Sequence, residues 1–123
     1  MKKSVLIVDD NEHLRRILGS ILHMCGYEVS EASTGADAIQ KAISKHPGII
    51  LMDIQLPDMS GLDAARALKN NPSTFKIPIL GCSASVGWEW KEQALGAGMV
   101  DFLVKPVSAT TLKAKLGAYL SDR

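Results

Sequence analysis

Cysteines, clustered basic residues and long apolar runs are scarce or missing in this sequence, and each absence excludes a class of protein. The two cysteines, Cys25 and Cys82, lie far apart in apolar surroundings. We predict that both are buried thiols in a reducing compartment, and that neither forms a disulfide or a metal site. The formal net charge is +1, and the lysines and arginines are scattered along the chain. This distribution argues against direct contact with nucleic acid or with a membrane surface.

The apolar segments are too short for membrane insertion or export. The first one ends at Asp9, which is too early for a signal peptide, and no later one approaches the length of a membrane span. The sequence therefore predicts a cytoplasmic protein.

A glycine-rich P-loop and a histidine–serine pair are also missing, and the three histidines have no metal-ligand spacing.

Strand-like and helix-like stretches alternate five times over 123 residues, the usual length of one domain. Several of the strand-like stretches are apolar on both faces, which predicts a parallel sheet covered by helices on each side. The expected strands are residues 4–8, 27–32, 49–52, 77–82 and 102–104. In such α/β folds, ligands bind at the carboxyl ends of the strands, near a topological switch point.

The residues that follow the expected strands share a chemistry. Asp9 and Asp10 follow the first strand, Asp53 the third, Ser83 the fourth and Lys105 the fifth. Carboxylates with few soft ligands nearby favour a hard cation, and Mg²⁺ leaves room for phosphate oxygens. A carboxylate can also attack phosphorus, with charge neutralised by a metal and a lysine. The sequence therefore predicts an aspartyl phosphoacceptor that uses Mg²⁺, with Mn²⁺ as an alternative ion.

Four motifs resemble those of response regulator receiver domains, the phosphoacceptor modules of two-component signalling. They are LIVDDNE from residue 6, LMDIQLPDMSG from residue 51, the Ser83-Ala84 pair, and FLVKP from residue 102. The four occur in the order and spacing of that family and cover essentially the whole chain. The resemblance implies a CheY-like, flavodoxin-like (βα)5 fold: a doubly wound parallel five-stranded sheet of order 2-1-3-4-5 with helices on both faces. Residues 1–123 would form a single receiver domain.

The resemblance also implies roles in phosphoryl transfer. Asp53 would accept the phosphoryl group. Lys105 would pair with Asp53 and then with the phosphoryl group, while the hydroxyl of Ser83 would turn toward a phosphoryl oxygen. Phe102 would be the aromatic switch that swings inward as this hydroxyl moves. The peptide bond between Lys105 and Pro106 would be cis.

The metal ligands implied by the resemblance are Asp10, Asp53 and the backbone carbonyl of Gln55. Asp9 would bind the ion mainly through water. Gln55 and Ser85 occupy the two variable positions that tune the lifetime of the phosphoryl group in the family. Ser85 is small, which predicts poor shielding of that group.

The implied function is a signalling switch that assists its own phosphorylation and dephosphorylation and is not an enzyme in the ordinary sense. A histidine kinase or histidine phosphotransfer domain would donate the phosphoryl group by docking near Leu14, Arg15, Leu18 and Pro106. An unknown downstream protein would recognise a population shift on the face of the fourth helix, fifth strand and fifth helix. The sequence shows no output domain, which fits a stand-alone regulator and a receiver from a longer protein equally well.

Trp88 and Trp90 depart from the family, in which this segment is usually polar or small. One interpretation is that one tryptophan packs on the core and the other covers a loop. The alternative is a state-dependent partner surface, because tryptophan is enriched at binding hot spots.

Several residues have simpler interpretations that the sequence leaves open. Asp9 and Asp10 are also suited to capping the first helix. Asp58 is interpreted as a turn aspartate, and Gly61 as a loop residue that needs unusual dihedral angles.

Two other functions are also considered. The first is a pseudo-receiver, a binding module that no longer takes phosphate; the presence of every acceptor residue argues against it. The second is a phosphohydrolase similar to haloacid-dehalogenase-like enzymes. Those enzymes resemble this chain in their aspartate nucleophile but carry a second acid two residues later, where this sequence has Gln55.

Overall fold

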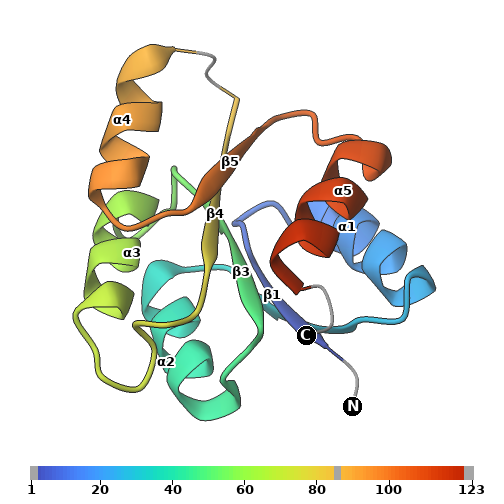
Figure 1. Ribbon diagram of the computed structural model, residues 1–123, viewed down its shortest axis with the longest axis horizontal. Helices are drawn as coiled ribbons and strands as arrows, with labels where there is room; N and C mark the ends of the chain where they lie inside the picture. The colour runs from blue at the N-terminus through green and yellow to red at the C-terminus, as the bar shows by residue number, and fades with distance from the viewer. Residues whose placement is uncertain (1–2, 85–86, 121–123) are drawn as a thin grey trace.

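A computed structural model describes residues 3–84 and 87–120 of the protein. Over these residues five strands alternate with five helices, as the sequence predicts (Figure 1). The strands are β1 (Ser4–Val8), β2 (Glu28–Ala32), β3 (Ile49–Asp53), β4 (Ile79–Ser83) and β5 (Asp101–Val104). The helices are α1 (Glu12–Met24), α2 (Gly35–Lys45), α3 (Gly61–Lys69), α4 (Trp88–Gly96) and α5 (Ala109–Leu120).

The strands form one parallel sheet in the order β2-β1-β3-β4-β5, which confirms the predicted fold. The chain moves from β1 outward to β2 and then crosses back to β3 on the other side of β1. This reversal places the carboxyl ends of β1 and β3 next to each other at the topological switch point. In the register of the sheet, Val8 at the end of β1 is paired with Met52, one residue before Asp53.

Helices cover both faces of the sheet because alternate strand residues point to opposite sides. Figure 1 shows α2, α3 and α4 on one side of the sheet and α1 and α5 on the other. Leu6 and Ile50 belong to the cluster of buried side chains under α2, α3 and α4. Val5 and Ile49 belong to the cluster under α1 and α5. The sheet is therefore the middle layer of the domain, with helices and buried side chains on each face.

Helix starts follow local sequence signals. Asn11 caps α1 by accepting a hydrogen bond from the amide of Leu14, and Thr34 caps α2 by accepting one from Asp37. Asn11 therefore holds the capping position of α1 that the sequence had left open to Asp9 and Asp10.

Over the described parts of the chain, none of the helices combines the length and the apolar character that a membrane span requires.

Two expectations about buried segments were wrong. The fourth strand begins at Ile79 and not at residue 77, because Pro78 has no amide hydrogen and the amide of Ile77 bonds to the carbonyl of Thr74 in the preceding turn. Cys82 is buried as predicted, but Cys25 is exposed. Cys25 follows the last residue of α1, where the chain turns away from the core through Gly26, whose φ is +89°.

Candidate functional site

Three aspartates meet at the carboxyl edge of the sheet. Asp9 and Asp10 follow β1, and Asp53 ends the adjacent β3, so the strand order brings them together. One carboxylate oxygen from each lies within 4.8 Å of the other two. Asp9 and Asp53 are 3% and 5% exposed, whereas Asp10 is open to solvent. The sequence predicted this grouping.

Lys105 neutralises part of the charge of the two buried acids. Its Nζ atom donates to Asp9 Oδ2 at 2.8 Å and to Asp53 Oδ2 at 3.1 Å. Burial would lower the pKa of Lys105, but its hydrogen bonds to Asp9 and Asp53 raise it above its ordinary value. The Lys105–Pro106 peptide bond is cis, as the resemblance predicts.

Asp53 remains costly to ionise despite Lys105. Burial raises the pKa of Asp53, and the negative charge of Asp9 adds to that effect, while hydrogen bonds from the Gln55 amide and from Lys105 lower it. The net pKa lies above the ordinary aspartate value. A further cation beside the three carboxylates would favour the charged form of Asp53.

Backbone amides orient both buried carboxylates. Asp9 Oδ1 accepts from the amide of Asn11 at 2.9 Å, and Asp53 Oδ1 accepts from the amide of Gln55 at 3.1 Å. Each buried acid therefore has one oxygen on a backbone amide and the other on Lys105. A carboxylate oxygen can accept more than one contact, so the oxygens of Asp9 and Asp53 that lie within 4.8 Å of an Asp10 oxygen could also serve as hard ligands for a cation.

Gly61 lies against the backbone of Asp53. A Cβ atom on residue 61 would overlap the carbonyl oxygen of Asp53 and lie 2.9 Å from the Cα atom of Ile54. The amide of Gly61 also donates to the carbonyl of Ile54 at 2.7 Å. The expectation that Gly61 needs unusual dihedral angles was wrong, since the positive-φ glycines are Gly26 and Gly98. Close backbone approach is what requires glycine here.

Residues 5–117 match the family described as response regulator receiver domain. The chain belongs to this family. Receiver domains are signalling domains of two-component systems, which confirms the resemblance found in the motifs.

Relatives of this receiver domain include both stand-alone regulators and parts of kinases. The chain is 34% identical over 122 residues to the polar-differentiation response regulator DivK of Brucella ovis, and covers 99% of each. It is 32% identical over 120 residues to the CAI-1 autoinducer sensor kinase/phosphatase CqsS of Vibrio cholerae. That match takes in 97% of this chain but only 18% of the length of CqsS.

Two solved structures have the same fold as this receiver domain. The chemotaxis protein CheY4 of Vibrio cholerae has a TM-score of 0.92 at 29% identity, with 97% of this chain and 99% of that chain covered. The receiver domain of the sensor histidine kinase PA1611 of Pseudomonas aeruginosa has a TM-score of 0.91 at 28% identity, with 99% and 100% covered. The PA1611 structure has a magnesium ion coordinated in its active-site cleft.

The residues expected to carry the signal lie on β4, β5 and α4. Ser83 ends β4, and its carbonyl accepts a hydrogen bond from the amide of Lys105 at 2.8 Å. The half-buried ring of Phe102 packs edge-to-face on Trp90, with ring centroids 5.3 Å apart and planes at 70°. Lys91 Nζ lies 5.5 Å from the centroid of the Phe102 ring. Ser85 lies outside the described residues.

The burial of Trp90 bears on the two interpretations of the tryptophans. Trp90 is 8% exposed and belongs to the buried cluster under α4. The packing interpretation therefore describes Trp90 in this structure, and a state-dependent partner surface at this residue stays a prediction. The side chain of Trp88 lies outside the part of the protein that the structure describes.

Only part of the predicted donor surface is accessible in the structure. Leu18 is 4% exposed and packs in the core, so its assignment to a docking surface was wrong. The side chain of Arg15 is 14% exposed; its Nη1 atom donates to the carbonyl of Asp9 at 2.5 Å and its Nε atom to Glu31 at 3.0 Å. Arg15 thus fixes the backbone at Asp9. Pro106 is exposed and Leu14 is half-buried, so both remain candidates.

Sequence reasoning also missed the partner of Asp58. This residue was interpreted as a turn aspartate, but its Oδ1 and Oδ2 accept hydrogen bonds from the amides of Gly35 and Ala36 at 2.8 and 3.0 Å. Those amides begin α2, more than twenty residues earlier in the chain. Only the general preference of carboxylates for helix N-termini could have suggested such a contact, and it does not say which helix.

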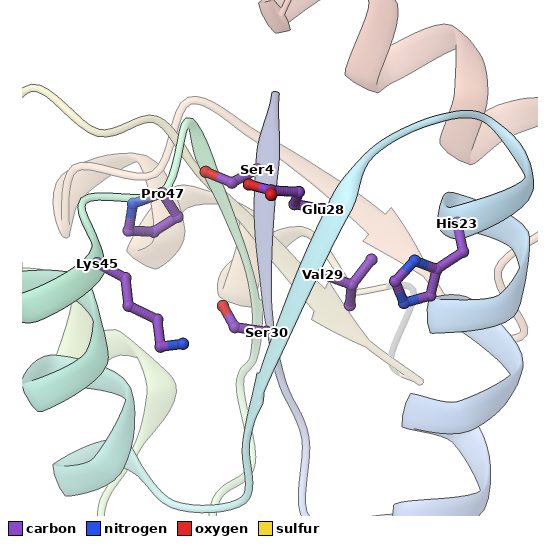
Figure 2. Close-up of a pocket in the computed structure, with 7 residues that line it drawn as sticks. All are labelled: Ser4, His23, Glu28, Val29, Ser30, Lys45 and Pro47. Atoms are coloured by element: carbon purple, nitrogen blue, oxygen red, sulfur yellow. The ribbon is translucent and has the colours of Figure 1, made fainter. Parts of the chain in front are cut away.

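A separate hollow of about 460 Å³ lies at the opposite end of the sheet from the aspartates (Figure 2). Figure 2 shows His23 on one side of β2 and Lys45 with Ser30 on the other. Its other lining residues are Ser4, Glu28, Val29 and Pro47. The strand separates His23 from Ser30, so these residues do not form a nucleophile–base pair.

Proposed function

We propose that this receiver domain is a phosphorylation-dependent switch that accepts a phosphoryl group on Asp53 from a histidine kinase or a histidine phosphotransfer domain. The observation that carries the proposal is the meeting of Asp9, Asp10 and Asp53 within 4.8 Å, with Lys105 bonded to two of them. The three carboxylates are hard oxygen ligands, two of them are buried, and the ammonium group of Lys105 lies beside these two. A purely structural role does not need three acids at one point, because like charges this close repel.

Mg²⁺ is the cofactor that this set of ligands suits, with Mn²⁺ as the alternative. Asp10, Asp53 and the backbone carbonyl of Gln55 would hold the ion directly, and Asp9 would hold it mainly through water. When bound, the ion supplies positive charge for the phosphoryl oxygens and keeps Asp53 ionised. Exposed Asp10 gives the ion access from solvent.

The transfer step exchanges one bond to phosphorus for another. An Oδ atom of Asp53 attacks the phosphorus of a phosphohistidine, the new P–O bond forms, and the P–N bond to the donor imidazole breaks. The electron pair of that bond stays on the imidazole. Lys105 then shifts from Asp53 to a phosphoryl oxygen, and the hydroxyl of Ser83 donates to another. Charge-assisted hydrogen bonds of this kind contribute about 1.5–3 kcal/mol each.

The signal is a population shift on the face formed by α4, β5 and α5. Phe102 on β5 moves with Ser83, and the exposed apolar side chains Leu95, Val100 and Val104 on or beside this face are suited to a downstream protein. Two new charge-assisted bonds are sufficient to bias two states that differ by a few kcal/mol. The donor docks against the first helix and the loop after β5, where Leu14 and Pro106 are the accessible candidates.

Incubation with a small phosphodonor and Mg²⁺, followed by intact-mass measurement, tests this function. We expect the mass of one phosphoryl group to be added to the wild type and to Asp63→Asn, in which an exposed aspartate of α3 is changed. Asp53→Asn is expected to show no addition. Removal of Mg²⁺ with a chelator should abolish the addition in all variants.

The same experiment distinguishes the two other functions. A pseudo-receiver would remain unmodified at every Mg²⁺ concentration. A phosphohydrolase would release phosphate continuously from varied esters without a lasting adduct. A slow decay of the adduct that changes in Gln55 or Ser85 variants would support their role in tuning the phosphoryl lifetime.

A further inference from the structure

The loop between β3 and α3 carries part of the proposed metal site and is held firmly at its base. Its first residues follow Asp53, and the amide of Gln55 orients the Asp53 carboxylate. At its other end, the amide of Gly61 closes onto the carbonyl of Ile54, and Ser60 faces Gln55 in an isolated antiparallel bridge. The loop is thus closed at its base like a hairpin, and residues 56–59 form its tip.

The tip of this hairpin is fastened to α2 through Asp58. Its two carboxylate oxygens each accept one amide hydrogen, from Gly35 at 2.8 Å and from Ala36 at 3.0 Å. Thr34, the cap of α2, takes the next amide, that of Asp37, at 3.0 Å. The first three amides of α2 are therefore all satisfied, two of them by a residue from a different segment. The hydrogen bonds from Gly35 and Ala36 hold the pKa of Asp58 below its usual range.

Packing supports the same attachment. A Cβ atom on Gly35 would lie 2.5 Å from Cγ of Met59, so the residue after Asp58 rests directly on the start of α2. Gly35 is itself buried, whereas Asp58 is exposed. A larger residue at position 35 would have to displace the Met59 side chain from this position. The contact between the hairpin tip and α2 thus combines close packing at Gly35 with the two hydrogen bonds of the Asp58 carboxylate.

We propose that Asp58 is a positioning residue for the metal site: by fixing the hairpin to α2, it holds the Gln55 carbonyl and the Gln55 amide in place beside Asp53. This inference rests on the proposed function, because it assumes that Gln55 and Asp53 hold Mg²⁺. It adds that the affinity for the ion depends on α2, a helix that supplies none of the expected ligands. Partners outside the ligand set that orient ligands commonly contribute tenfold or more to metal affinity.

The direct test is Asp58→Asn, in which the side chain keeps its size and one acceptor oxygen but loses its charge and its second acceptor. We expect the Mg²⁺ dissociation constant, measured by calorimetry, to rise about tenfold. Asp63→Asn is the matched control, because Asp63 is an exposed aspartate near the same hairpin that pairs only with Arg66 on its own helix among the contacts of the described residues. Its dissociation constant should match that of the wild type. Circular dichroism checks that each variant is folded.

A second measurement separates positioning of the metal site from a general loss of structure. The rate of Asp53 phosphorylation is measured by intact mass over a range of Mg²⁺ concentrations. For Asp58→Asn we expect the half-maximal Mg²⁺ concentration to rise about tenfold, with a plateau rate within about twofold of the wild type. An unchanged half-maximal concentration, or a lowered plateau without any shift, would overturn the inference.

The outcomes also keep this inference distinct from the proposed function. If the wild type binds Mg²⁺ but takes no phosphoryl group, the proposed function fails, while the calorimetric comparison still decides the role of Asp58. If the wild type binds no Mg²⁺, both fail. If the wild type is phosphorylated and Asp58→Asn binds Mg²⁺ as tightly, only the role of Asp58 is lost.

Discussion

The main chain of Gly61 lies so close to that of Asp53 that a Cβ atom on residue 61 would overlap the Asp53 carbonyl oxygen and lie 2.9 Å from its carbonyl carbon. Both groups are backbone, so neither can rotate away. Gly61→Ala is expected to lower the free energy of unfolding by about 1–3 kcal/mol, the usual cost of overpacking. It should also slow phosphorylation, because the shift falls on the acceptor residue. Denaturant unfolding and intact-mass kinetics check the two effects.

Gly117→Ala is the matched control for this substitution. Gly117 lies inside α5, and a Cβ atom there would meet nothing within 4 Å. Alanine in a helix interior is more favourable than glycine by about 0.5–1 kcal/mol, so this variant should be slightly more stable than the wild type. Equal destabilisation by the two substitutions would contradict the backbone contact at Gly61.

Asp53→Asn is expected to stabilise the metal-free protein at neutral pH. Burial raises the pKa of Asp53, so the folded protein holds this proton to higher pH than the unfolded chain does. Stability is therefore lost as the pH rises above about 3.9, the ordinary aspartate value, toward the higher pKa of the folded state. The asparagine variant avoids this loss. Unfolding curves with a chelator present should differ most near pH 7 and converge below about pH 4.

A neutral side chain at residue 53 leaves the ion pair between Lys105 and Asp9 intact. The comparison therefore isolates the charge of Asp53. If Asp53→Asn were less stable than the wild type at pH 7 without divalent ions, Lys105 would be compensating the charge of Asp53 fully. The conclusion that Asp53 is costly to ionise would then be wrong.

Mg²⁺ is expected to stabilise the wild type. An ion that binds only the folded state adds about 2.7 kcal/mol at a concentration one hundred times its dissociation constant. Asp10→Asn should lose most of this gain and still fold, because Asp10 is exposed. Thermal unfolding with Mg²⁺ and then with excess chelator measures the effect. An equal gain in Asp10→Asn would exclude Asp10 from the metal site.

Arg15 is expected to matter for stability, whereas its neighbour Arg16 is not. Arg15 is largely buried and bonds both the Asp9 carbonyl and Glu31, while Arg16 is 74% exposed in its pair with Glu12. Arg15→Gln should lower the free energy of unfolding by about 1.5–3 kcal/mol, and Arg16→Gln by no more than about 0.5 kcal/mol. Similar effects of the two substitutions in denaturant unfolding would contradict this difference.

Trp90 should report on the movement of Phe102. In a Trp88→Phe background, Trp90 is the remaining tryptophan of the sequence. Its ring is buried and packs edge-to-face on Phe102, so an inward swing of Phe102 on phosphorylation should change its fluorescence emission. The change should require a phosphodonor and Mg²⁺ and be absent in Asp53→Asn. Constant emission on a fully phosphorylated sample would mean that Phe102 does not move against Trp90.

Local patterns in the sequence were sufficient to predict the fold class and the site. The alternation of apolar strands with helices predicted a parallel sheet, and the residues at the strand ends, Asp9, Asp10, Asp53 and Lys105, predicted an acidic site with a lysine. Periodicity and position at a strand end are properties of neighbouring residues, and they are read directly from the chain. The order of the strands came from the family resemblance and not from the periodicity.

Other features were decided only by the tertiary structure. Leu18 is buried while Leu14, one helical turn earlier, is half-buried, and Trp90 is buried in a segment whose polarity pattern is weak. Asp58 found its partners at Gly35 and Ala36, in a helix that precedes it by more than twenty residues. The physical reason is common to all three: each depends on which surface of another segment lies opposite the side chain. That is settled when the helices pack on the sheet, and no local pattern records it.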